Sequence, residues 1–188
     1  MYSLYIDTHG TYVTIVLFKD GIVLIKKEID SDCSHSRNTM PLIKQILDDE
    51  NINPKDLNEI IVVNGPGSFT GVRIGVTIAK TLAYTLNIPI KVVSSLLIKA
   101  ISFDSDSSKI VIISDNKGKY IGEFDQNNVE LEPYKYLKNK EYESFMINKE
   151  IIDNIEIDYD RVYKYLKEVK ALNAHKVNPI YVKNIEVK

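Results

Sequence analysis

The sequence predicts an α/β fold made of two related halves. The first half has the order strand, helix, strand in its later part, which implies a parallel strand pair and a right-handed crossover. The segment KIVIISD at 109–115 repeats the pattern of LYID at 4–7, an apolar strand followed by aspartate. A polar stretch, DSDSS at 104–108, lies before the repeat. Such a stretch is typical of a linker, so we expect domains at 1–103 and 104–188, the second one smaller.

The first half is expected to open with three strands, at 3–7, 12–18 and 22–29. Asp20-Gly21, between the last two, is a strong signal for a tight hairpin turn. Apolar residues at helical spacing then predict a helix around 38–50. Further along, we expect a doubly buried strand at 60–64, a helix from about Thr70 to Leu86, a strand at 90–94 and a short helix at 95–103.

The second half has a weaker pattern. Strands are expected at 109–115 and 119–125, and only short strands can be placed within 127–154, which is rich in Lys, Glu and Tyr. Apolar residues on one side of 161–172 predict a helix, and NPIYVKN at 178–184 predicts a final short strand.

Composition limits the class of function. The net charge is −2 and the pI is near 6.0, so the chain does not present the strongly basic surface of a nucleic-acid-binding protein. A role with RNA would run through a partner. Cys33 is the single cysteine, which excludes an internal disulfide, and no basic-then-apolar leader opens the chain. We therefore expect a cytoplasmic protein, and no apolar run approaches the length of a membrane span.

The glycine-rich stretch NGPGSFTGVRIG at 64–75 is the most distinctive feature of the sequence. A phosphate-binding loop would need Lys and Ser or Thr directly after its last glycine, and a dinucleotide fingerprint would need G-x-G-x-x-G. Neither spacing occurs here. Ser68 and Thr70 are natural N-cap residues for the helix that follows.

Helix packing is the alternative purpose for these glycines. One stripe of the helix is small, at Gly71, Gly75, Ala79 and Ala83, and the next is large, at Ile74, Ile78, Leu82 and Leu86. The apolar arc is wider than one sheet face covers. Either a neighbouring helix of this chain or a partner protein completes the cover, and an ordinary core helix remains an alternative.

The run GPGSFTGVRIGVTIAKTLAYTLNIP, followed by VSSL, closely resembles the signature of the TsaB (YeaZ) family. Further landmarks are IDT at 6–8, HSxxxxPLI at 35–43, the turn at Asp115 and NPIYVKN near the end. The resemblance implies the fold of actin, hexokinase and the heat-shock ATPases (ASKHA), with two duplicated halves and a reduced second half.

The resemblance also implies a function. TsaB-like proteins are non-catalytic partners of the transferase TsaD in forming threonylcarbamoyladenosine in tRNA, together with the ATPase TsaE. We expect a TsaD-like heterodimer, a possible homodimer of the free chain, and tRNA contact only through the complex. The implied partner interface comprises Met40, Ile43, Leu47, Gly71, Val72, Gly75, Val76, Ala79 and Ala83.

The residues needed for catalysis are incomplete. Asp7, Thr8 and Asp115 match degenerate phosphate loops, but no glycine follows Gly122 to hold an adenosine. His35 is followed four residues on by Thr39, which does not match a His-x-x-x-His metal site. We expect no cofactor on this chain, with ATP and metal on partner subunits. The alternative is a small-molecule kinase or ATPase of the same fold; a peptidase lacks a visible nucleophile, and Cys33 is read as incidental.

Overall fold

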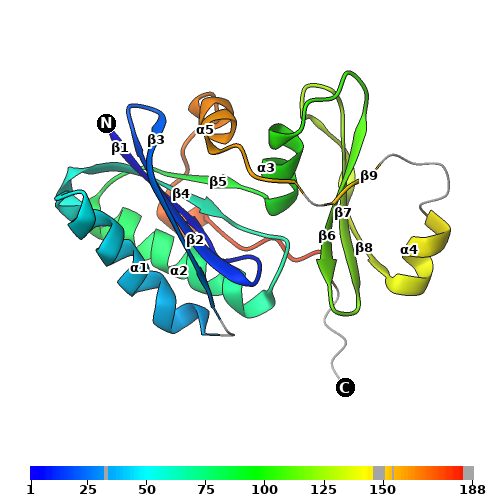
Figure 1. Ribbon diagram of the computed structural model, residues 1–188, viewed down its shortest axis with the longest axis horizontal. Coiled ribbons are helices and arrows are strands. Elements are labelled where there is room, and N and C mark those ends of the chain that lie inside the picture. Colours follow the sequence, from blue (N-terminus) through cyan, green and yellow to red (C-terminus); the bar gives the residue numbers. More distant parts are fainter. Residues whose placement is uncertain (32–33, 146–150, 154, 184–188) are drawn as a thin grey trace.

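The two halves of the chain repeat one strand order. The structure, a computed structural model, describes residues 1–188 apart from 32–33, 146–150, 154 and 184–188 (Figure 1). The first sheet has the order β3-β2-β1-β4-β5 and the second the order β8-β7-β6-β9. Each contains a three-stranded antiparallel meander, with a later strand added parallel to the first strand of that half. The predicted α/β fold with two related halves and a smaller second half is confirmed.

The first half follows the sequence prediction closely. Its strands are β1 (Tyr2–Asp7), β2 (Tyr12–Lys19), β3 (Ile22–Asp30), β4 (Leu57–Val63) and β5 (Ile90–Val93). Its helices are α1 (His35–Asp49), α2 (Phe69–Leu86) and α3 (Ser95–Ser102), with a 3₁₀ turn at Pro54–Asp56. Asp20 and Gly21 both have positive φ, at 53° and 90°, as a tight hairpin turn between β2 and β3 requires.

Helices cover both faces of the first sheet (Figure 1). Leu4 and Ile6 of β1 point into a core shared with α1 and α2. Tyr5, between them, points to the opposite face, where α3 and α5 contribute Ile98 and Leu166. Because successive side chains of a strand alternate between faces, a strand buried on both faces is apolar throughout. This explains the continuous apolar runs of β1 and β4.

The second half differs more from the prediction. Its elements are β6 (Lys109–Asp115), β7 (Gly118–Phe124), β8 (Glu130–Lys138), α4 (Asn139–Phe145), β9 (Ile151–Ile152), α5 (Tyr159–Lys167) and a 3₁₀ turn at Ala174–Lys176. A nine-residue strand and a helix thus occupy part of the region where only short strands were expected. The prediction of a final strand was wrong, because residues 178–183 form no ladder.

The end of the chain returns to the first sheet. Leu172 donates its backbone N–H to Ile90 O of β5 at 2.8 Å, and Val177 is buried in the core beneath α2. Ile180 then donates to Asn64 O, just after β4, at 2.7 Å. The predicted domain boundary between 103 and 104 stays a prediction, because segments after it pack against the first sheet as well as forming the second. Along the described ranges, no helix is long and apolar enough to cross a membrane.

Candidate functional site

The turn after β1 contains the first predicted degenerate phosphate loop. Asp7 is 8% exposed, and its Oδ1 accepts the backbone N–H of His9 at 3.0 Å and lies 2.6 Å from His9 Nδ1. Thr8 Oγ1 donates to the carbonyl oxygen of Gly71 at 2.7 Å. Both side chains therefore already bond to groups of this chain.

The glycines of the stretch 64–75 make room for this turn. A Cβ on Gly71 would lie 2.1 Å from Thr8 O, and one on Gly75 would lie 2.3 Å from Thr8 Oγ1. A Cβ on Gly67 would lie 2.4 Å from His9 O. Such distances are far inside van der Waals contact, so larger residues would separate α2 from the first turn. The glycines of this stretch therefore let the chain pack closely against its own Thr8 and His9.

Most residues of the predicted partner interface are buried within this chain. Eight of its nine residues lie in the core of this chain: Ile43, Leu47, Gly71, Val72, Gly75, Val76, Ala79 and Ala83. Met40, the ninth, is 45% exposed. The six on α2 face the first sheet, its strand-end turn and α1, and Ile43 and Leu47 of α1 belong to the same core. Whether the helix pair binds a partner stays a prediction.

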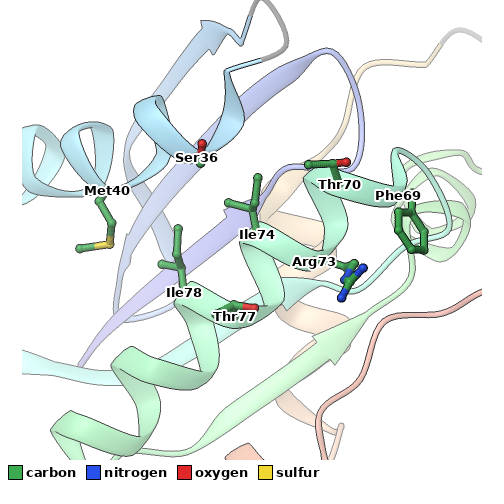
Figure 2. A pocket seen from close by; sticks show the side chains of 8 residues that line it. All are labelled: Ser36, Met40, Phe69, Thr70, Arg73, Ile74, Thr77 and Ile78. Atoms are coloured by element: carbon green, nitrogen blue, oxygen red, sulfur yellow. The ribbon is translucent and has the colours of Figure 1, made fainter.

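A shallow groove lies on the exposed side of the same two helices (Figure 2). Its volume is about 460 Å³, and it is lined by Ser36, Met40, Phe69, Thr70, Arg73, Ile74, Thr77 and Ile78. Met40 from α1 and the two isoleucines from α2 supply apolar side chains, while hydroxyls and Arg73 supply polar ones. Most of these residues were missed as site residues. The sequence did carry a signal for the groove, because Ile74 and Ile78 belong to the stripe of large apolar residues beside the stripe of glycines and alanines.

An aromatic contact joins this groove to the end of the chain. The guanidinium carbon of Arg73 lies 5.0 Å from the centroid of the Phe69 ring, within the range of a cation–π interaction. Phe69 also contacts Tyr181, with ring centroids 5.6 Å apart. The N-terminal turn of α2 therefore contacts both the groove and the carboxyl-terminal segment.

The turn after β6 contains the second predicted loop residue. Asp115 Oδ2 accepts hydrogen bonds from Lys183 Nζ at 2.9 Å and from Tyr136 OH at 3.0 Å, and Oδ1 accepts the backbone N–H of Asn116 at 2.7 Å. Partial burial opposes ionisation of Asp115, but these hydrogen bonds outweigh it and hold its pKa below the usual value. The carboxylate is thus satisfied by this chain's own donors.

Between the two halves lies a larger cleft of about 720 Å³. Its walls come from the start of α2, from β7 and β8, from α4 and from the carboxyl-terminal segment. They include Ser68, Phe69, Lys117, Tyr120, Tyr136, Lys138, Glu141, Tyr181 and Lys183. Across the described ranges, no three His, Cys, Asp or Glu side chains are grouped so that they could hold a metal ion. Cys33 lies outside the described residues.

Comparisons with known proteins agree with this geometry. The family model "TsaD: tRNA N6-adenosine threonylcarbamoyltransferase" matches residues 30–121. The chain is 46% identical over 96 residues to the tRNA threonylcarbamoyladenosine biosynthesis protein TsaB of Bacillus subtilis (strain 168), covering 51% of this chain and 42% of that relative. Against TsaB of Escherichia coli (strain K12), it is 36% identical over 100 residues, covering 53% of this chain and 43% of the relative. The matched segments thus span less than half the length of these curated relatives.

The likeness of fold extends over the whole chain. The solved structure of YeaZ from Pseudomonas aeruginosa superposes with a TM-score of 0.78, covering 96% of this chain and 99% of that one, at 17% sequence identity. The chain therefore shares the ASKHA-like fold of YeaZ, with two α/β halves that repeat one strand order beside a cleft. Over about half of its length, the chain is similar in sequence to proteins named TsaB, at 46%, 35% and 36% identity.

Proposed function

We propose that this chain takes part in forming threonylcarbamoyladenosine in tRNA, as a non-catalytic partner of a TsaD-like transferase. The names of the curated relatives support the pathway, although the matched segments are only part of those proteins. The groove between α1 and α2 is the observation that supports partner binding. In this proposal, the TsaD-like subunit docks there, a TsaE-like ATPase joins the assembly, and the complex works in the cytoplasm.

The groove has the chemistry of a helix-docking surface. Exposed Met40, half-buried Ile74 and Ile78, and exposed Phe69 bring apolar and aromatic area together along α1 and α2. Side chains of these kinds, and arginine, are the ones enriched at the centres of protein interfaces. A partner helix laid along the groove would cover the apolar side chains and leave Arg73 at the rim for a carboxylate. The same surface would serve a second copy of this chain when no partner is present.

The strand-end turns favour a non-catalytic role. A phosphate loop has to present free donors to the ligand, whereas Thr8 Oγ1 donates to Gly71 and Asp7 accepts from His9. On the second turn, Asp115 is paired with Lys183. We therefore propose that this chain holds no nucleotide or metal of its own and that the catalytic groups lie on the partner.

A matched pair of variants tests the docking proposal. Ile74→Glu places a charge in the groove, and Thr85→Glu places the same charge on an exposed part of α2 outside it. We expect the first to weaken binding to the TsaD-like subunit at least 100-fold by isothermal titration calorimetry, because the charge would be buried unpaired. We expect the affinity of Thr85→Glu for the TsaD-like subunit to stay within twofold of that of the parent chain. Equal affinities for the two variants would contradict the groove as the docking site.

The rival function is a small-molecule kinase or ATPase of the same fold, and the cleft between the halves is the observation that favours it. Saturable binding of ATP by the isolated chain, with hydrolysis lost in Asp7→Ala, would support the rival. Absence of ATP binding, together with tight association with the transferase, would support the partner role. Loss of threonylcarbamoyladenosine from bulk tRNA after depletion of this protein, measured by nucleoside mass spectrometry, tests the pathway itself.

A further inference from the structure

One end of the second sheet gathers lysines from three parts of the chain. In the sheet register, Gly118 of β7 pairs with both Asp115 of β6 and Lys138 of β8. The β6–β7 turn therefore lies beside the start of α4, where the Asn139 N–H donates to Lys117 O at 3.4 Å. The carboxyl-terminal segment adds one more lysine through its ion pair with Asp115. We call this region the lysine end; it comprises Lys117, Lys119, Lys138, Lys140 and Lys183.

The charge of the second sheet is polarised along its strands. The opposite end carries Glu123, Asp125, Glu130 and Glu132, since Phe124 pairs with Glu130 there. These four carboxylates stand against two lysines, buried Lys109 and Lys135, which is paired with Glu132. At the lysine end, the carboxylates are Asp115, Glu141 and Glu143, and Asp115 is already paired with a lysine. Five lysines against three carboxylates leave a local positive charge on a chain whose net charge is −2. Local charge of this kind steers polyanions even when the whole chain is acidic.

Aromatic rings accompany these lysines. Lys183 Nζ lies 4.7 Å from the centroid of Tyr136, which lines the cleft. Lys119 Nζ lies 5.0 Å from the centroid of Tyr142, which packs with Ile121 on the other face of the sheet. Tyr136 and Tyr181 line the cleft between the halves together with Lys117, Lys138 and Lys183. Tyr181 is 57% exposed, so its ring has area for a further contact. A cleft that offers both cations and rings suits a ligand with alternating phosphates and bases.

We infer that the lysine end and the adjoining cleft form a contact site for single-stranded RNA. Proteins that bind single strands combine a positive groove that follows the phosphates with rings on which bases stack. The lysines come from two strand ends and from the carboxyl-terminal segment. Because they are spread out, they suit a ligand with several phosphates in a row better than a ligand with one phosphate. The inference rests on the proposed function, in which the RNA is an unpaired stretch of tRNA. It adds a direct contact by this chain to contacts made by the transferase.

Salt dependence of RNA binding gives the test. The variant Lys117→Gln/Lys138→Gln/Lys140→Gln removes three charges from the lysine end. The control Lys164→Gln/Lys167→Gln/Lys170→Gln removes three exposed charges at and just after α5, which lies at the top of Figure 1, whereas α4 lies at the lower right. Binding of a fluorescently labelled, unmodified tRNA transcript to the full chain is followed by anisotropy between 50 and 200 mM salt. The slope of log affinity against log salt should fall by about two for the first variant, at about 0.7 per phosphate contact, and stay unchanged for the control.

Each other outcome has a defined meaning. Equal slopes for the two triple variants, or no binding of tRNA by the parent chain at 50 mM salt, would overturn the inference. So would displacement of the tRNA by equimolar ATP, which would indicate a mononucleotide pocket. If the triple variant is unfolded by circular dichroism, Lys140→Gln alone should lower the slope by about 0.7. Binding of the transferase, measured in parallel, separates this inference from the docking proposal, because only the groove variant should affect it.

Discussion

Thr8 and Gly71 are joined by a 2.7 Å hydrogen bond from the threonine hydroxyl to the glycine carbonyl, although 63 positions separate them. The bond holds the turn after β1 against the first turn of α2. Ser68 donates its backbone N–H to His9 O at 2.7 Å beside it. The turn predicted as a degenerate phosphate loop is thus hydrogen-bonded to a helix of the same chain. The helix is the one whose outer side forms the groove.

The close approach of Gly75 to Thr8 predicts a stability cost that depends on the threonine. In Gly75→Ala, the new Cβ meets Thr8 Oγ1, and we expect the free energy of unfolding to fall by about 1–2 kcal/mol. In a Thr8→Ala background, the hydroxyl is gone and the same change should be neutral or stabilising by up to about 1 kcal/mol, because alanine favours helix. Urea denaturation of the four proteins of this cycle measures the difference. A cost of Gly75→Ala that is identical in both backgrounds would refute the contact.

The ion pair of Lys183 with Asp115 predicts a pH-dependent contribution to stability. The pKa of Asp115 is lowered in the folded state, so its contribution is present above the unfolded pKa and is lost as pH falls through the folded pKa. Because both side chains are partly exposed, Lys183→Gln should lower the free energy of unfolding at pH 7 by no more than about 1 kcal/mol. The difference between variant and parent should shrink below pH 4. A difference that is constant from pH 7 to pH 3 would exclude the ion pair as its cause.

Buried Tyr5 predicts a loss of stability at alkaline pH. Burial, together with the charge of Asp7, raises its pKa well above the usual value. A raised pKa in the folded state keeps its contribution intact below the unfolded pKa, near 10, and loses it as pH rises further. The titration of Tyr5 should therefore lower the free energy of unfolding by about 1.4 kcal/mol for each pH unit above pH 10. Tyr5→Phe should reduce the slope of unfolding free energy against pH between 10 and 11.5 by about 1.4 kcal/mol per pH unit, and Tyr12→Phe, at an exposed position, is the control variant.

Phe69 predicts a link between the groove and the carboxyl-terminal segment. Phe69→Ala removes the ring that lies between Arg73 and Tyr181. We expect about tenfold weaker binding of the transferase, together with faster hydrogen exchange at the Ile180 amide, which bonds to Asn64 O. Tyr84→Ala is the control, since Tyr84 is an exposed aromatic on α2 that does not line the groove. Unchanged exchange at Ile180 in Phe69→Ala would show that the two sites are independent.

Periodicity predicted the first half well, because its signals are local. Alternation and β-branched runs indicated β1, β2 and β4, and Asp20-Gly21 indicated the turn between β2 and β3. In the second half, β8 is an edge strand with a proline and several charges, ELEPYKYLK, so its apolar pattern is weak. Residues 178–183 contain the strand-like apolar run Ile180 to Val182, but Ile180 bonds to a single group, Asn64 O, a contact that no local pattern encodes.

The sequence by itself determined the fold class, the succession of strands and helices along the first half, the two N-cap candidates Ser68 and Thr70, and the family resemblance; the structure selects Ser68 as the cap. These depend on side-chain spacing and on backbone preferences within a few residues. Only the tertiary structure decided which part of the apolar arc of α2 is covered. It turned Gly71 and Gly75 toward Thr8 and left Ile74 and Ile78 in the groove, because a helix wheel orders side chains around an axis but does not say where the neighbours lie. It also brought Lys183 to Asp115, 68 positions away, a contact set by the path of the whole chain.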